Sequence, residues 1–218
     1  MIKTLLAIVM LTFSLNANAT HHRGHAVMHL DNAILRLGQS VNAARLYRDQ
    51  DARGMLTVTE QAEFDSFKGQ PKQEALIAAW VGQKKAENPD GTAIYNQISH
   101  ANKYIIYANK YLNRLDAART QLLTGGDLDE IRRLINSPGS TGELESGLWG
   151  FSSVDSIWES LVSAELTNYT RFRGVHTLSR KAHQSANWAL WHVNDGIREE
   201  IYQDPIFICS GPNNHCGQ

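Results

Sequence analysis

The sequence lacks an excess of either charge, and it lacks the short motifs of the common enzyme classes. Its 218 residues include 21 basic and 22 acidic side chains, a balance that gives no indication of nucleic-acid binding or attraction to an anionic membrane. The patterns Gly-x-Ser-x-Gly, His-Glu-x-x-His, the phosphate loop and Cys-x-x-Cys-His are absent. Alternating runs of strand-forming residues are also missing, so the sequence predicts an all-α protein.

Cysteine is scarce, and both cysteines stand close to the end of the chain. Cys209 and Cys216 flank a Gly-Pro-Asn-Asn turn. In an oxidising compartment we expect them to form a local disulfide that closes a C-terminal tail over residues 205–218. A Cys/His metal site is the alternative, although two cysteines and one histidine are too few ligands for a closed zinc site.

The first nineteen residues have the pattern of a bacterial signal peptide. Lys3 precedes an apolar run of about a dozen residues, which ends in Asn16-Ala-Asn-Ala19 with an Ala-x-Ala cleavage pattern. The run is shorter than the roughly 20 residues that a membrane helix needs, and no later run is long and apolar enough. We therefore expect residues 1–19 to be removed, with an uncleaved anchor as the alternative. The remaining chain is expected to be periplasmic or secreted, without a membrane span.

Apolar spacing predicts a helical domain over residues 20–204. A first helix is expected over 26–47, and the clearest helix over 93–123, where apolar residues recur every 3.5 positions for three heptads. Gly125-Gly126 should end that helix, and Asp127 should cap the next. The predicted fold is a helical bundle with a long coiled-coil-like helical hairpin. The heptad residues are Ile94, Ile98, Ala101, Ile105, Ala108, Leu112 and Leu115.

Three tyrosines flank this heptad seam. Tyr104, Tyr107 and Tyr111 lie three and four residues apart, which puts them on one side of a helix. They could pack against another helix of the same chain. Alternatively, they form an aromatic patch that binds a partner protein.

Residues 49–60 read Asp-Gln-Asp-Ala-Arg-Gly-Met-Leu-Thr-Val-Thr-Glu. This segment resembles the calcium loop of the EF-hand family, in which oxygens come from positions 1, 3, 5, 7, 9 and 12 and position 6 is glycine. Gly54 stands at position 6, whereas Arg53 departs from the pattern at position 5 because it has no acceptor. The resemblance implies calcium ligands at Asp49, Asp51, Met55 through its carbonyl, Thr57 and Glu60. The same residues also have a simpler interpretation, in which Thr57 and Glu60 form a capping box for the following helix.

Histidines gather just after the expected cleavage point. Cleavage after Ala19 would leave Thr20-His21-His22 at the amino terminus. The free amine of Thr20, two backbone amides and the imidazole of His22 could then bind copper(II) or nickel(II). A polar, disordered start is the alternative. Further along, His176, His183 and His192 are interpreted as packing or surface residues.

These observations predict a non-enzymatic, exported helical protein that acts through protein contacts or self-association. The expected architecture is similar to the helical minor-pilin subunits of bacterial conjugation and type IV secretion systems, which implies a role as an accessory subunit of an envelope assembly. A calcium-binding or copper-binding module is the second hypothesis. A cell-envelope hydrolase that uses carboxylates such as Glu143 and Glu159 is the third.

Overall fold

The protein is built from helices. The computed structural model describes residues 2–136 and 169–196, with side chains described over 21–136 and 174–194, and the described residues include no strand. The predicted all-α fold is therefore confirmed. None of the described helices combines the length and the apolarity needed to cross a membrane. In chain order the elements are α1 (Ile2–Leu46), η1 (Tyr47–Ala52), η2 (Arg53–Met55), α2 (Val58–Asp65), α3 (Gln73–Glu87), η3 (Pro89–Gly91), α4 (Ala93–Thr124), α5 (Leu128–Ile135), α7 (Tyr169–Trp191) and η5 (His192–Gly196).

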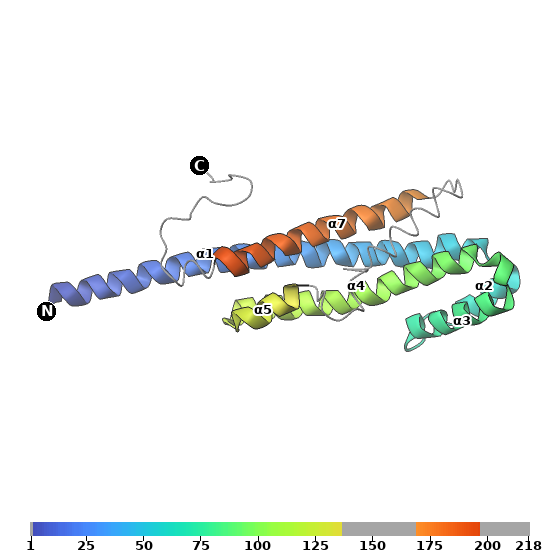
Figure 1. Ribbon diagram of the computed structural model, residues 1–218, viewed down its shortest axis with the longest axis horizontal. Coiled ribbons are helices and arrows are strands. Elements are labelled where there is room, and N and C mark those ends of the chain that lie inside the picture. Colours follow the sequence, from blue (N-terminus) through green and yellow to red (C-terminus); the bar gives the residue numbers. More distant parts are fainter. Residues whose placement is uncertain (1, 137–168, 197–218) are drawn as a thin grey trace.

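Three long helices, α1, α4 and α7, lie side by side and form the body of the molecule (Figure 1). Helix α1 runs in one direction, and α4 and α7 both run in the opposite direction. Each helix buries a row of residues that recurs at alternating spacings of three and four, as in helices packed at a small crossing angle. These rows include Ala26, Leu30, Ala33, Leu37, Val41 and Ala44 on α1; Ile98, Ala101, Ile105, Ala108, Leu115 and Leu122 on α4; and Val175, Ser179, Ala182, Ala186, Ala189 and Val193 on α7 and η5.

Helix α4 confirms the predicted rod. It spans Ala93–Thr124, and five of its seven predicted heptad residues are fully buried, whereas Ile94 and Leu112 are partly buried against the core. The helix ends at Gly125, whose φ of 75° lies in the left-handed region that glycine adopts without steric cost.

Helix α1 begins earlier than the sequence pattern predicts. A start near residue 26 was expected, whereas the helix runs unbroken from Ile2 to Leu46. The prediction of the start was wrong because residues 2–25 contain no proline and only Gly24, so nothing in them interrupts the helix. As a consequence, the histidines near residue 20 stand on helical backbone. Figure 1 shows the first part of α1 extending beyond the ends of α5 and α7.

Helices α2 and α3 form a small layer against α4 at the opposite end of α1. The ring of Trp80 on α3 lies 5.7 Å from the ring of Phe64 and 6.2 Å from that of Tyr95. The indole nitrogen of Trp80 also donates a hydrogen bond of 2.8 Å to Glu63. This aromatic cluster holds the short helices in place.

Candidate functional site

Helix α1 presents four histidines within nine residues. His25 lies three positions after His22 and four after His21, and His29 lies four after His25, spacings that put side chains on one side of a helix. His21 is exposed and the other three are half-buried. The rings of His21 and His25 pack edge to face with centroids 4.4 Å apart.

A fifth histidine joins them from the far end of the chain. His192 begins η5, directly after α7, and α7 runs antiparallel to α1, so its last turn lies beside the histidines of α1 (Figure 1). The Nδ1 atoms of His22 and His192 are 2.9 Å apart. The ring of His192 also stacks on those of His25 and His29, with centroids 5.3 and 5.4 Å away. His192 is 9% exposed and is the centre of this histidine cluster, which consists of His21, His22, His25, His29 and His192.

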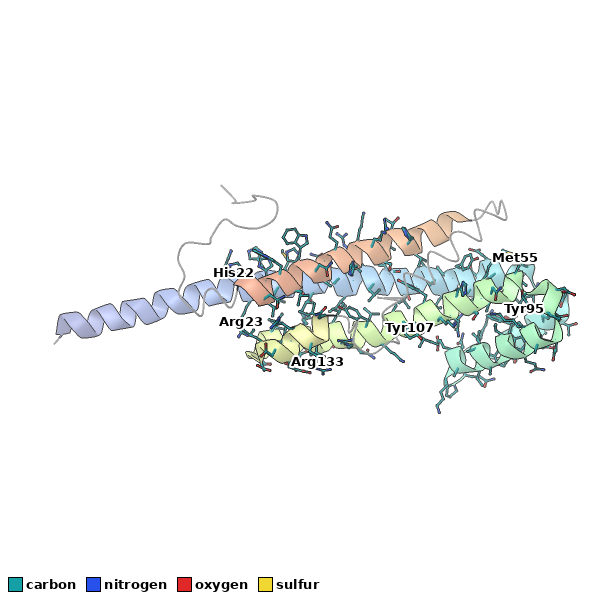
Figure 2. The ribbon with its side chains drawn as sticks, in the orientation of Figure 1. His22, Arg23, Met55, Tyr95, Tyr107 and Arg133 are labelled. Carbon is teal, nitrogen blue, oxygen red and sulfur yellow. The ribbon has the colours of Figure 1, made fainter. Side chains whose placement is uncertain are left out.

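Two tryptophans border the histidine cluster. The ring of Trp191 lies 6.1 Å from that of His22 and 4.8 Å from that of His192. The ring of Trp188 stacks on His29 at 6.3 Å. Both indoles pack against the cluster, and Figure 2 shows the labelled His22 on α1 beside the end of α7.

The surroundings favour uncharged imidazoles. Burial, followed by the charges of the neighbouring histidines His22, His29, His25 and His21, lowers the pKa of His192 from 6.5 to about 3. Burial, followed by the charges of His21 and His25, lowers the pKa of His22, and burial lowers that of His29. At neutral pH these three rings therefore carry lone pairs rather than extra protons.

Neutral imidazoles are good ligands for zinc, copper and nickel. Two nitrogens bound to one ion at right angles, each at about 2.0 to 2.1 Å, are separated by about 2.9 Å. The Nδ1 atoms of His22 and His192, which share a hydrogen bond, have the same separation, so an ion would replace the proton between them. As the side chains stand, no group of three or more His, Cys, Asp or Glu residues among the described positions is arranged around a single ion position. A third ligand therefore has to come from a ring that turns, or from the backbone.

The segment that resembles a calcium loop is largely helical. Residues 47–52 form η1 and residues 53–55 form η2, so Asp49 and Asp51 stand on helical backbone. Both carboxylate oxygens of Asp49 accept hydrogen bonds from the buried guanidinium of Arg48, at 2.6 and 3.2 Å. Arg53, at the fifth position, forms an ion pair with Asp65 rather than facing the segment.

The last part of this segment forms the capping box expected as its simpler interpretation. Glu60 Oε2 accepts from the Thr57 amide at 2.9 Å, and Thr57 Oγ1 accepts from the Glu60 amide at 3.4 Å. The other oxygen of Glu60 accepts from the hydroxyl of Tyr95, and the side chain of Met55 is exposed. The structure thus places Asp49 and Glu60 in separate contacts within the chain.

Two of the three heptad tyrosines are buried inside the protein, so the proposed aromatic patch for a partner is not present on its surface. Tyr104 is 0% exposed and bonds to Ser40 of α1, and Tyr111 is 2% exposed and donates to the carbonyl of Ile135. Tyr104 and Tyr111 pack within the chain because α4 lies between α1 and α5. Only Tyr107 is half-exposed, with Lys110 Nζ 5.6 Å from its ring centre.

Other predicted site residues fall outside the described side chains. The backbone of Thr20 is part of α1, but its side chain is not among those described. Cys209, Cys216, Glu143 and Glu159 lie outside the described residues altogether.

His192 is the site residue that sequence reasoning did not recognise. Its sequence context indicates a packing or surface residue, because His192 falls on roughly the opposite helical face from His176 and His183. Its partner His22 is 170 positions away. The signal that could have identified it is the row of buried residues on α7, which ends at Val193 and would place His192 at one end of an antiparallel helix pair.

No protein-family model, no curated protein and no solved structure significantly matches the chain.

Proposed function

We propose that the protein binds a divalent transition-metal ion, with copper(II) preferred, through its histidine cluster. The observation that carries the proposal is the approach of His22 and His192, whose Nδ1 atoms are 2.9 Å apart at the junction of α1 and α7. Rotation of the two rings would direct both nitrogens at one ion without movement of the helices.

The chemistry of the surrounding side chains supports this choice of ion. Imidazole nitrogen suits copper, nickel and zinc, and copper(II) binds most tightly of the three to a given set of nitrogen ligands. The histidine cluster has five imidazoles on two helical segments, so three imidazoles remain available beside the two proposed ligands. His25 and His29 stack on His192, so a rotation of either ring could bring a third nitrogen to the ion.

The position of the cluster supports binding as well. The ring of His192 is almost completely buried between two antiparallel helices, whereas His22 is half-buried, so one side is shielded and the other is open to an incoming ion. A bound ion would connect residues from both ends of the described chain and would stabilise the folded state, because only that state brings His22 and His192 together.

Calorimetric titration of the apo protein with copper(II), zinc(II) and magnesium(II) tests the proposal. We expect copper(II) to bind more tightly than zinc(II), and magnesium(II) not to bind, because magnesium prefers oxygen ligands. Trp191, whose ring centre is 6.1 Å from that of His22, should lose fluorescence when copper(II) binds.

The decisive variant is His192→Gln, with His176→Gln as its matched control. His176 lies on α7, sixteen residues before His192 and roughly 24 Å away along the axis. In the full chain, His192→Gln should weaken copper(II) binding by more than about tenfold, and His176→Gln should leave it unchanged. Equal affinities in the wild type and both variants would overturn the proposal.

A further inference from the structure

We propose that proteolytic processing completes the metal site, because removal of residues 1–19 creates a backbone ligand set that the longer chain does not have. This inference rests on the proposed function. In the processed chain, copper(II) is held by the amine of Thr20, the amide nitrogens of His21 and His22, and Nδ1 of His22. Nδ1 of His192 is the fifth ligand.

The first step is the position of the cleavage point. The sequence places it after Ala19, and His22 is the third residue beyond it. Figure 1 shows the part of α1 before the histidines extending past the ends of α5 and α7, and Figure 2 places His22 beside the end of α7. Cleavage would therefore produce a new amine directly at the edge of the histidine cluster.

The second step concerns the two amide groups. In an α-helix the N–H of each residue donates to the carbonyl four positions earlier, so in α1 the amides of His21 and His22 donate to residues 17 and 18. Cleavage removes both acceptors. The first four N–H groups of a helix have no partner within the helix, and residues at a chain end unwind at little cost. Processing thus releases the same two amides that the site needs.

The third step is the chelate geometry. The neutral amine and the two amide nitrogens close two five-membered rings on the ion. Nδ1 is the imidazole nitrogen nearest the backbone, and it closes a six-membered ring with the amide nitrogen of its own residue. Copper(II) replaces the two amide protons, which pass to solvent, and the four nitrogens form the square plane that this ion favours.

The fourth step is the role of His192. Nδ1 of His22, the atom that the chelate requires, is the atom that faces Nδ1 of His192 at 2.9 Å. An axial ligand of copper(II) stands farther from the ion than the four ligands in the plane, and therefore roughly 3 Å from each of them. His192 is therefore close enough to the chelate to act as an axial ligand, which a free peptide with the same first three residues does not possess.

The experiment compares the full chain with the chain processed during bacterial export. Mass spectrometry should show that the exported protein begins at Thr20; a different first residue would overturn the inference. The processed protein should bind copper(II) with the visible absorption and electron paramagnetic resonance signals of a four-nitrogen plane. It should also release about two more protons per ion than the full chain, as measured by calorimetry in buffers of different ionisation enthalpy.

Two substitutions at position 21 distinguish the contribution of the backbone amide to copper(II) binding from that of the imidazole side chain. In the processed protein, His21→Pro removes the amide hydrogen of residue 21, and proline is accepted in the first turn of a helix. His21→Gln removes the same imidazole but keeps the amide. We expect His21→Pro to lose the four-nitrogen signal and His21→Gln to keep it, with circular dichroism confirming that both are folded.

The outcomes distinguish this inference from the proposed function. Copper(II) binding that is identical in the full chain, the processed chain and His21→Pro would overturn processing as the activating step and leave the imidazole site standing. Failure of both the full and the processed chain to bind copper(II) would overturn both proposals.

Discussion

Arg48 is a charged side chain with only 1% of its surface exposed. Its guanidinium donates to Asp49 at 2.6 Å and to the side chain of Asn102 at 2.5 Å, and it lies 3.9 Å from a carboxylate oxygen of Glu74. Asn102 in turn donates to the backbone carbonyl of Glu74 at 2.7 Å. A buried charge is tolerated when it is paired and hydrogen-bonded, so these contacts join η1, α4 and α3 at one point.

The Asp49→Asn variant tests this structural role against the calcium hypothesis. Removing the charge leaves the buried Arg48 short of a counter-ion, so the free energy of unfolding should fall by about 1–3 kcal/mol. Chemical denaturation in calcium-free buffer measures the loss, with Asp90→Asn in the exposed turn after α3 as the control. A loss that appeared only with calcium present would instead indicate the ligand role that the EF-hand resemblance implies.

Asp65, the last residue of α2, makes the stability of the folded protein depend on pH. Hydrogen bonds from Arg53 and then Lys68 lower the pKa of Asp65 from 3.8 to about 2. A depressed carboxyl pKa means that the folded state binds the proton less readily than the unfolded state. The stabilisation is therefore complete above about pH 4 and is lost as the pH falls toward about 2.

We expect the wild type to lose its stability advantage over Asp65→Asn across this pH window. The side chain is 35% exposed, so solvent reduces the size of the effect. Thermal melts of both proteins between about pH 5 and pH 2 measure it, because the two melting temperatures should converge at the acid end. A constant difference over the whole range would contradict the assignment.

At the scale of single elements, the helix ends are specified by short-range contacts. Thr57 and Asp127 each accept a hydrogen bond from the amide of the third residue of the helix that follows, and Gly125 ends α4 in the left-handed region. Such caps satisfy backbone groups that the helix itself leaves without partners.

Two glycine-to-alanine substitutions should have opposite effects. Gly125→Ala forces a side chain into a φ of 75° and should lower the free energy of unfolding by about 1 kcal/mol. Gly82→Ala lies inside α3, where an added Cβ meets no atom within 4 Å, and should raise it by about 0.5–1 kcal/mol. Urea denaturation of both variants is the measurement. Stabilisation by Gly125→Ala would show that α4 does not end as described.

At the scale of the whole molecule, small residues on α7 allow it to pack closely against α1. The buried row on α7 contains Ala182, Ala186 and Ala189, each at most 1% exposed. Small side chains bring two helix axes closer together, and this approach lets Ser40 of α1 donate to the backbone carbonyl of Val175 at 3.1 Å. The same packing of α7 on α1 fixes the position of His192 along α1 and therefore its contact with His22.

Enlarging one of these alanines should therefore affect both stability and the site. Ala186→Leu adds volume to a closed interface and should cost about 1–3 kcal/mol, whereas Gln184→Leu on the exposed side of α7 should cost much less. Thermal denaturation measures stability, and copper(II) titration should show weaker binding in Ala186→Leu alone. Unchanged stability in that variant would contradict the close packing of α7 on α1.

The sequence by itself determined the features that depend on neighbouring residues. The all-α fold, the heptad row of α4, the Thr57–Glu60 capping box and the end at Gly125 were all predictable, because helical spacing and caps involve residues within a few positions of one another. His21 and His22 were recognised beside the expected cleavage point for the same reason. The start of α1 was missed, because the sequence has no breaker where a boundary was expected.

Only the tertiary structure decided which distant residues meet. The pairing of His22 with His192 spans 170 positions, and that of Ser40 with Tyr104 spans 64. No local pattern encodes such pairs, since they follow from how long helices align along their full lengths. The same alignment buried Tyr104 and Tyr111, which spacing alone could equally place on the surface. The candidate metal site is therefore a product of helix packing, with four of its histidines visible in the sequence and the central one visible only in the fold.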